Sequence, residues 1–382
     1  MRTLLTNARI VLPNQLIERA TLLLEDDRIA AIDPVAPRAD VVVDLAGALL
    51  LPGLVDLHCD ALEKDVEPRP NALFPLDFAV ATADRRSAFC GITTIFHAVS
   101  FAHGELGVRS AATAAAIVAS IAEARQHTLV DNRVHARYEV TDPHSMPLLG
   151  ELLTGAQVDA LSFMDHTPGQ GQFKSLEAYQ RHLRQSYGVD ANAAVAIIDQ
   201  KRAQHADAYD RVRSLATLAR AGDVPLISHD DDSPGRVARM AEFGVRISEF
   251  PVNLETARAA TAAGMHTVFG APNVLRGQSQ SGSMRAIEAV RAQVAACLCS
   301  DYAPSTLLAA TLRLPQLSNL SLPQAVGLVT ANPAHAVGLR DRGELAVGLR
   351  ADCIAVDTSR TYPQVAAVWV AGCPVLRLAM GR

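Results

Sequence analysis

Two kinds of hydrophobic pattern divide the chain. Residues 1–50 contain short apolar runs, such as ATLLLEDDRIAAI, separated by Asn, Asp, Pro and Gly. Residues 343–376 repeat this pattern in GELAVGLRADCIAVD and QVAAVWVAG. Short runs bounded by turn-forming residues are typical of β-strands. We therefore expect both termini to form one small β-sandwich domain, built from residues 1–50 and 343–382.

The middle of the chain alternates apolar runs with helical patterns. Helical stretches are expected at 109–126, 176–221 and 254–263. Eight strand candidates lie around and between them: 54–60, 91–99, 134–142, 159–167, 224–231, 245–252, 266–272 and 296–302. Strands that alternate with helices give parallel sheets, and eight such units close into a barrel. The sequence predicts an α/β protein with a (β/α)8 TIM-type barrel over residues 51–342.

Length and composition agree with this architecture. The chain has 382 residues, 49% of them hydrophobic and 20% charged, as in a globular enzyme. An α/β barrel takes about 250 residues, which leaves room for a satellite domain. The net charge is -5 and no basic stripe is present, so nucleic acid is not expected as a partner. The most apolar helical stretch, Ser110 to Ala122, is too short to span a bilayer, and no membrane partner is expected.

The cysteines and the first residues indicate a cytoplasmic protein with reduced thiols. No CxxC pair occurs among the six cysteines, and the chain is too long for a disulfide scaffold. The first residues, MRTLLTNARIVLPNQ, lack the long apolar stretch of a signal peptide.

Side chains that bind metals recur at the carboxyl ends of the predicted strands. They are His58, Asp60, Glu139, Asp142, Asp165, His166, His229, Asp230, Asp231, Asp232, Glu249 and Asp301. In an α/β barrel, the loops after the strands build the active site. Polar groups at these positions therefore indicate chemistry.

The spacing His58-x-Asp60 places two ligands on the same side of one strand, where both can hold one ion. Glu139 can bridge two ions, with His166 and His229 on the second ion. Asp301 then faces the bound hydroxide as ligand and general base. Imidazole and carboxylate suit zinc, manganese or iron, and a metal lowers the pKa of bound water to about 7. We expect one or two divalent ions, with zinc preferred.

Structural alternatives exist for each residue taken alone. A histidine at a strand end can be purely structural, and Asp301 can instead cap a helix. Asp231 and Asp232 are interpreted as solvated loop carboxylates or helix caps, and Glu249 either orients a neighbour or binds an ion. The number of such groups at one end of one barrel favours the metal site.

The segment PGLVDLH at 52–58, the strand-end ligands, Asp301 and the split β-domain resemble the amidohydrolase superfamily. Within it, the sequence is most similar to the diphosphatases of phosphonate utilisation. The motifs that carry this similarity include MDHTPGQ (164–170), GAPN-x2-RG (270–277), SDY (300–302) and LPQAV-x-LVT-x-NPA (322–334).

The resemblance implies hydrolysis of α-D-ribose 1-methylphosphonate 5-triphosphate with release of diphosphate, so the expected partner is a small phosphorylated anion. Arginine and lysine bind phosphate, although Arg69 and Arg276 can instead be ordinary surface residues. We further expect a homo-oligomer, with a dimer favoured. The candidate substrate-binding residues are Lys64, Arg69, Gln170, Asn273, Arg276 and Ser281.

Several substrate-side positions differ from the family pattern, whereas the metal ligands do not. Cys59 and Ala61 stand where the family has Thr and Asn, Gly171 replaces an arginine, and Gln280 and Ser283 replace a histidine and an asparagine. Two alternatives stay open. One is an amidohydrolase that cleaves a C–N bond of another anionic small molecule, as an amidase, deaminase or cyclic-amide hydrolase. The other is a non-catalytic metal-binding barrel. Asp301 argues against it, because a binding protein needs no general base.

Overall fold

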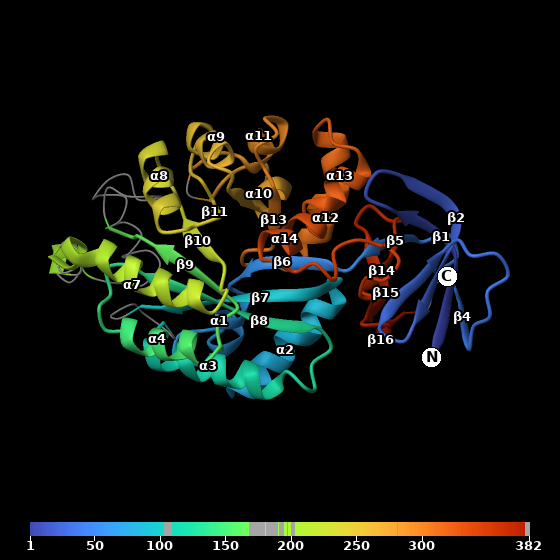
Figure 1. The fold of residues 1–382 in the computed structure, drawn as a ribbon, viewed down its shortest axis with the longest axis horizontal. Coiled ribbons are helices and arrows are strands. Elements are labelled where there is room, and N and C mark those ends of the chain that lie inside the picture. Colours follow the sequence, from blue (N-terminus) through green and yellow to red (C-terminus); the bar gives the residue numbers. More distant parts are fainter. Residues whose placement is uncertain are drawn as a thin grey trace.

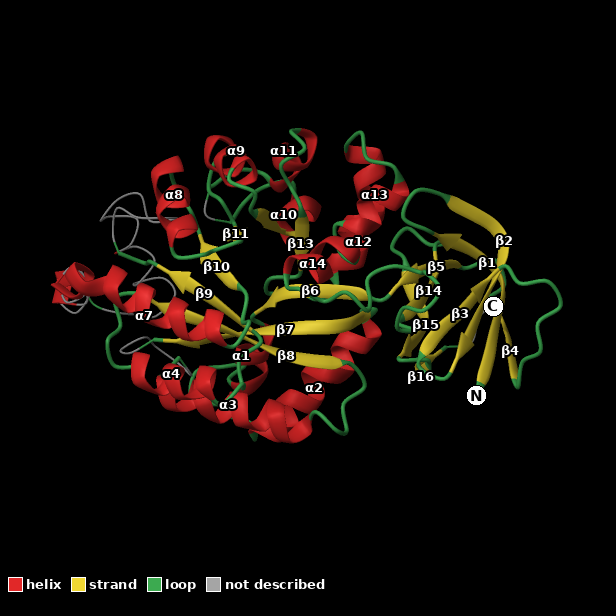
Figure 2. Ribbon diagram, viewed as in Figure 1, coloured by secondary structure: helices red, strands yellow, loops and turns green. Residues whose placement is uncertain are grey.

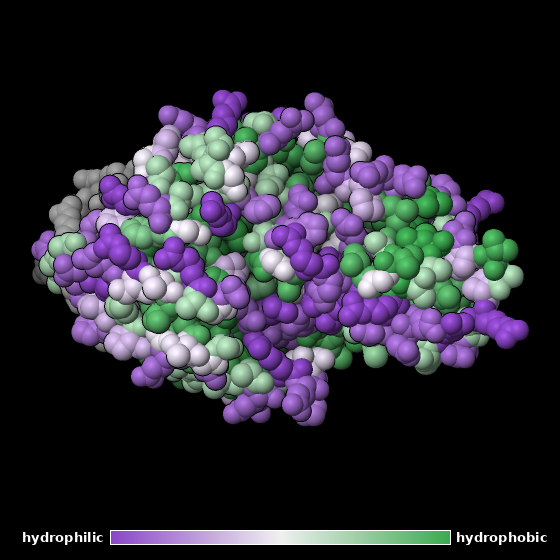
Figure 3. All heavy atoms as spheres, in the orientation of Figure 1, coloured by the Kyte–Doolittle hydropathy of each residue, from purple (hydrophilic) through white to green (hydrophobic). Residues whose placement is uncertain are grey.

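The computed structural model contains a barrel surrounded by helices and, beside it, a sheet built from both termini (Figure 1, Figure 2). It describes residues 1–102, 109–167, 203–280 and 282–378, together with single positions 180, 190, 195–196 and 198–199. No helix in these parts of the chain is long and apolar enough to cross a bilayer. Hydrophilic side chains cover much of the face in Figure 3, with smaller groups of hydrophobic ones between them.

Eight strands form the barrel, and each overlaps one of the predicted ranges. Neighbours in the chain are neighbours in the sheet, and all pair in parallel. The predicted α/β barrel is therefore confirmed. The strands are β6 (Leu54–Cys59), β7 (Ile92–Phe101), β8 (Asp131–Glu139), β9 (Ala160–Met164), β10 (Leu226–His229), β11 (Ile247–Glu249), β12 (His266–Gly270) and β13 (Cys297–Cys299).

Backbone hydrogen bonds between the first and last strands close the barrel. Cys59 forms a parallel bridge with Asp301. The Asp301 amide donates to the His58 carbonyl at 2.9 Å, and the Asp60 amide donates to the Asp301 carbonyl at 3.1 Å. Residues expected to bind a metal thus lie where the barrel closes.

The helices cover the outside of the barrel. Val134, Ala136 and Tyr138 of β8 pack outward in one core cluster with Ile117 and Val118 of α3. Since side chains alternate along a strand, the intervening residues of β8 face the barrel interior. The helices are α1 (Ala61–Val66), α2 (Leu76–Phe89), α3 (Ala111–Ala124), α4 (Met146–Thr154), α7 (Ala208–Ala221), α8 (Pro234–Glu242), α9 (Leu254–Ala262), α10 (Ala271–Arg276), α11 (Ala286–Arg291), α12 (Thr306–Leu317), α13 (Leu322–Gly327) and α14 (Ala331–Ala336), with a 3-10 turn η1 (His205–Asp207) before α7.

The terminal strands form one mixed sheet, in the order β16-β15-β14-β5-β1-β2-β3, with β4 also paired to β1. β5 pairs with β1 from the N-terminal part and with β14 from the C-terminal part, so it joins the two ends of the chain. The domain limits after residues 50 and 342 stay a prediction. The strands are β1 (Arg2–Val11), β2 (Leu16–Glu25), β3 (Arg28–Ile32), β4 (Val41–Asp44), β5 (Leu49–Pro52), β14 (Cys353–Asp357), β15 (Gln364–Val370) and β16 (Cys373–Arg377).

Gly53 connects the terminal sheet to the barrel. Its amide donates to the carbonyl of Asp352 at 2.9 Å. A Cβ atom on Gly53 would lie 2.1 Å from Oγ1 of Thr93, which is fully buried. The glycine of the PGLVDLH motif is therefore required by the close approach of β7, and it fixes the start of the strand that carries His58.

Candidate metal centre

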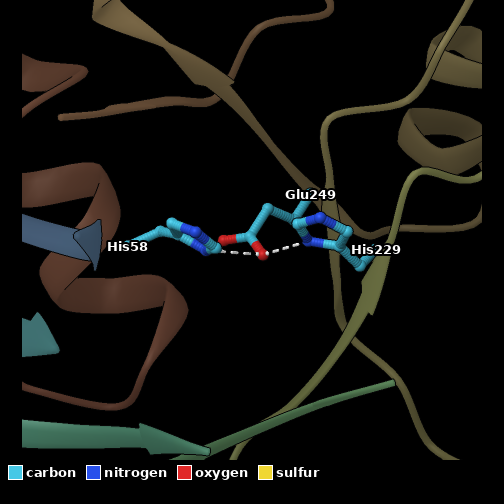
Figure 4. Close-up of side chains that lie close together, drawn as sticks. All are labelled: His58, His229 and Glu249. Atoms are coloured by element: carbon cyan, nitrogen blue, oxygen red, sulfur yellow. Dashed lines mark hydrogen bonds and ion pairs between the residues drawn. The ribbon is translucent and has the colours of Figure 1, made fainter. Parts of the chain in front are cut away.

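Two histidines and one glutamate converge at the carboxyl end of the barrel. His58 is the next-to-last residue of β6, His229 ends β10 and Glu249 ends β11. The Nδ1 atoms of both histidines lie 2.9 Å from Oε2 of Glu249. Figure 4 shows the carboxylate between the two imidazoles. All three side chains are buried, and the imidazole centroids are 5.6 Å apart.

The donor set of this cluster fits a divalent ion. Burial lowers the pKa of both His58 and His229 to about 3, so both rings are neutral, which is the form that binds metals. Although Nδ1 of His58 lies 2.9 Å from Oε2 of Glu249, this contact lacks hydrogen-bond geometry. Neither this nitrogen nor the buried Oε1 atom of Glu249 forms a hydrogen bond with any described residue. Two imidazoles and a carboxylate are typical ligands of zinc, manganese or iron.

A second cluster shares His58. Ligand atoms of His58, Asp60 and Asp301 lie within 4.8 Å of one another. Burial, followed by repulsion from Asp60, holds the pKa of Asp301 well above its usual range. Asp301 also has a φ of 55°, which is uncommon for a residue other than glycine. Two close carboxylates, with the pKa of Asp301 raised, favour a bound cation at this position.

Glu139 and His166 form a separate pair. Oε2 of Glu139 lies 2.9 Å from Nδ1 of His166, and Oε1 accepts a hydrogen bond from Thr141 at 2.8 Å. Among the described residues, two groups offer three ligand atoms within 4.8 Å, and this pair belongs to neither of them. The bridging role of Glu139 and the ligand role of His166 stay predictions.

Two residues at this end of the barrel, His135 and Arg137, were not predicted from the sequence, and Asp230 was a candidate without an assigned role. His135 donates from Nδ1 to the carbonyl of Leu57 at 2.9 Å, and its buried Nε2 has no hydrogen-bond partner among the described residues. Arg137 lies two residues further along β8, buried, with Nη1 3.8 Å from Oδ2 of Asp60. Burial raises the pKa of Asp230 to about 6. In the sequence, His135 and Arg137 alternate with the outward-facing residues of β8, and this alternation was the signal that both face the barrel interior.

The interpretation of Asp231 as a solvated carboxylate or helix cap is wrong. Its side chain is fully buried and accepts hydrogen bonds from the hydroxyls of Ser228 and Ser248. Nε of Arg236 also donates to it at 3.2 Å, and Nη1 of the same arginine reaches Asp165 at 3.3 Å. Asp231 therefore compensates a buried guanidinium behind the centre. The helix cap of α8 is Ser233, two residues further along the chain.

Those predicted substrate-binding residues that the structure describes follow strands at the same end of the barrel. Lys64 on α1 and Arg69 after it are exposed, as is Arg276, which ends α10 and donates to the Tyr302 hydroxyl at 3.3 Å. The Asn273 amide is used in the fold. It donates to the carbonyl of Met284 at 3.2 Å and accepts from the amide of Ala286 at 2.9 Å. Gln170, Gly171 and Ser281 lie outside the described residues.

Comparison with known proteins places most of the chain in one family. A sequence model of the amidohydrolase family matches residues 49–382. The alpha-D-ribose 1-methylphosphonate 5-triphosphate diphosphatase of Escherichia coli (strain K12) is 33% identical over 375 residues, which cover 97% of this chain and 99% of that protein. A dihydroorotase of Pediococcus pentosaceus is 41% identical over only 59 residues, 15% of this chain and 14% of that protein.

Solved structures share the fold at low sequence identity. The 5-methylcytosine deaminase from Klebsiella pneumoniae superposes with a TM-score of 0.67 at 17% identity, over 100% of this chain and 98% of that chain. The N-isopropylammelide isopropylaminohydrolase from Burkholderia multivorans gives a TM-score of 0.65 at 19% identity, over 99% of this chain and 98% of that chain. These similarities concern the architecture alone.

Proposed function

Because this chain belongs to the amidohydrolase family, we propose that it is a metal-dependent diphosphatase that hydrolyses a phosphorylated ribose. The preferred substrate is the one that names its Escherichia coli relative, alpha-D-ribose 1-methylphosphonate 5-triphosphate. The observation that carries the proposal is the buried convergence of His58, His229 and Glu249, with Asp301 beside His58.

The residues of the centre divide into ligands and a base. His58, His229 and Glu249 would hold one divalent ion, with zinc preferred and manganese or iron as alternatives. Asp60 and Asp301 would face it from the side of the barrel closure. A divalent ion bound there acts as a Lewis acid and lowers the pKa of a bound water to about 7. Glu139 and His166 are the candidates for a second ion.

We assign the proton transfer to Asp301. Its carboxylate accepts a proton from the attacking water and returns it to the oxygen of the diphosphate leaving group. A pKa raised by burial and by Asp60 makes this carboxylate a stronger base than an exposed aspartate. The hydrogen bonds of its backbone to β6 hold it beside His58 during the transfer.

Cations around the mouth of the barrel would bind the polyphosphate. Lys64, Arg69 and Arg276 are exposed and follow β6 and β12. Guanidinium groups bind phosphate in a bidentate manner, and lysine adds a point charge. Gln170 and Ser281 stay candidates through the family resemblance. Asn273 would act by holding residues 284–286 against α10.

The proposal is tested with protein that has been stripped of metal and then reloaded with zinc, manganese or iron(II). Each form is incubated with the ribose triphosphate, with nucleoside triphosphates and with a panel of N-acyl and cyclic-amide compounds. We expect metal-dependent release of diphosphate, measured by phosphorus NMR. Hydrolysis of the C–N compounds alone would contradict the diphosphatase and establish the amidohydrolase alternative. Bound metal without turnover of any compound would indicate the non-catalytic barrel.

A further inference from the structure

Arg137 lies in the interior of the barrel, next to the metal centre. It belongs to β8, on the same face as His135 and Glu139, while Ala136 and Tyr138 pack outward in the core between barrel and helices. Its exposed fraction is 6%, so the guanidinium is almost completely removed from water. A cation in such a place needs acceptors, because an unpaired buried charge is costly.

Two of the three nitrogens of this guanidinium group are not satisfied within the described part of the chain. Nε and Nη1 are buried and have no hydrogen-bond acceptor there. The nearest ion-pair partner given by the structure is Oδ2 of Asp60, 3.8 Å from Nη1. That distance allows an electrostatic attraction but is too long for a hydrogen bond.

Two other buried arginines show what a purely structural arginine looks like in this fold. Arg236 donates to Asp231 and to Asp165. Arg342 donates to Asp131 at 2.7 Å, to Thr94 at 2.9 Å and to both oxygens of Asp341. Each is held by at least two carboxylates, whereas Arg137 has one distant carboxylate. The Nε and Nη1 donors of Arg137 are therefore available to a ligand.

The nearest ion-pair partner of Arg137 belongs to the second ligand cluster. Asp60, whose Oδ2 lies 3.8 Å from Nη1 of Arg137, groups with His58 and Asp301 within 4.8 Å. His58 also belongs to the His58–His229–Glu249 cluster. Arg137 is therefore close enough to interact with an anion bound at that cluster.

We propose that Arg137 is a substrate-binding residue whose guanidinium donates to the oxygens of the phosphoryl group under attack. The inference rests on the proposed function and assigns a specificity residue to it. A phosphoryl group brings negative oxygens that satisfy both the charge and the free N–H groups of Arg137. A neutral amide brings one carbonyl oxygen and leaves the buried charge uncompensated. Arg137 would thus select phosphorus over acyl substrates.

The test measures the binding of inorganic phosphate to the zinc-loaded, full-length protein by calorimetry, with zinc content and thermal unfolding recorded for each variant. Arg137→Met removes the charge and the donors, and Arg137→Lys keeps only the charge. Arg133→Met is the matched control, because Arg133 lies on the same face of β8 but pairs with Asp131 and Asp159. We expect Arg137→Met to weaken phosphate binding by about tenfold to a hundredfold. The phosphate affinity of Arg137→Lys should lie between those of wild type and Arg137→Met. Arg133→Met should bind phosphate like wild type.

Each other outcome overturns the inference. A wild-type phosphate affinity of zinc-loaded Arg137→Met would exclude a contact with the anion. If only the methionine variant loses zinc, a wild-type affinity of zinc-loaded Arg137→Lys would exclude it in the same way. Loss of zinc in both variants would show that Arg137 serves the metal centre instead. The proposed function is judged separately. If phosphate binding depends on Arg137 but no triphosphate releases diphosphate, only the proposed diphosphatase function is contradicted. If diphosphate is released but phosphate binding does not depend on Arg137, only this inference is contradicted.

Discussion

The backbone amide of Asp301 donates a hydrogen bond to the carbonyl oxygen of His58 at 2.9 Å. This bond belongs to the closure of the barrel, and it brings the last strand to the residue shared by both ligand clusters. Asp301 adopts a φ of 55° to make it. Such a conformation costs of order 1–3 kcal/mol for a residue other than glycine, and it is retained only where the surroundings hold it. Closure of the fold and assembly of the candidate centre therefore depend on the same contact.

Replacing Asp301 by asparagine separates its chemical role from its structural role. Asparagine tolerates a positive φ and has nearly the same shape, so folding should be retained. It has no carboxylate to accept a proton. We expect the turnover of Asp301→Asn to fall by about 10²-fold or more, with zinc content and thermal unfolding close to those of wild type.

Asp223→Asn is the control for this variant. Asp223 has a φ of 55° but is exposed, and it precedes β10 at the opposite end of the barrel. It should keep wild-type turnover. If Asp301→Asn also kept wild-type turnover across the working pH range, the base would have to be another residue.

Gly53→Ala tests the contact between β6 and β7. The new Cβ would lie 2.1 Å from Oγ1 of buried Thr93 and would force the two strands apart. Overpacking of this kind costs about 1–3 kcal/mol, and the free energy of unfolding should fall by that amount in urea titrations.

Gly235→Ala provides the comparison. Gly235 lies in the first turn of α8, and, apart from its chain neighbours and the backbone of its own helix, no described residue has an atom within 4 Å of the position of its Cβ. Alanine is the better helix former by up to about 1 kcal/mol, so this variant should be as stable as wild type or slightly more stable. Equal stability of the two alanine variants would contradict the tight contact at Gly53.

Arg236→Met should be strongly destabilising. It leaves two buried carboxylates, Asp165 and Asp231, without their shared cation. Removing one partner from a buried ion pair costs about 3–5 kcal/mol. The exposed pair of Arg213 and Asp210 is the reference, and Arg213→Met should change stability by about 1 kcal/mol or less. Chemical denaturation measures both, and similar losses would show that the Arg236 network is not needed.

The pair of His205 and Asp165 predicts a pH dependence. Nε2 of His205 lies 3.2 Å from Oδ2 of Asp165, and this hydrogen bond raises the pKa of the histidine above its ordinary 6.5. Because the folded protein binds the proton more tightly, the stabilisation is complete below the unfolded pKa and is lost as pH rises through the folded pKa. The stability difference between wild type and His205→Gln should therefore shrink as the pH rises above 6.5, the ordinary pKa of the unfolded state. An NMR pKa for His205 at or below 6.5 would contradict this prediction.

The strands could be predicted because their signals are local. Apolar runs bounded by turns located all eight strands of the barrel, and the polar residues at their ends located the candidate centre. The start of β8 was missed. Asp131, Asn132 and Arg133 look like loop residues, but Asp84 and His97 bind the asparagine amide, and Asp159 pairs with Arg133. Those partners come from other segments of the chain, which the local sequence does not reveal.

Roles that depend on the closed barrel could not be read from the sequence. Glu249 belongs to a strand of three residues, and only the barrel brings it between His58 and His229. An arginine in the middle of a strand resembles a surface residue, so Arg137 attracted no hypothesis. Asp231 lies in a run of polar residues typical of a solvated loop, and its burial depends on Arg236.

The most direct test of the account is an anomalous difference map from crystals of the zinc-loaded protein, collected at the zinc edge. We predict a peak between the side chains of His58, His229 and Glu249, about 2.0–2.3 Å from a nitrogen of each histidine and an oxygen of the glutamate. A peak bound by the histidines, with Glu249 only hydrogen-bonded to their rings, would reduce the glutamate to an orienting role. No peak at His58 and His229 would contradict the metal centre itself.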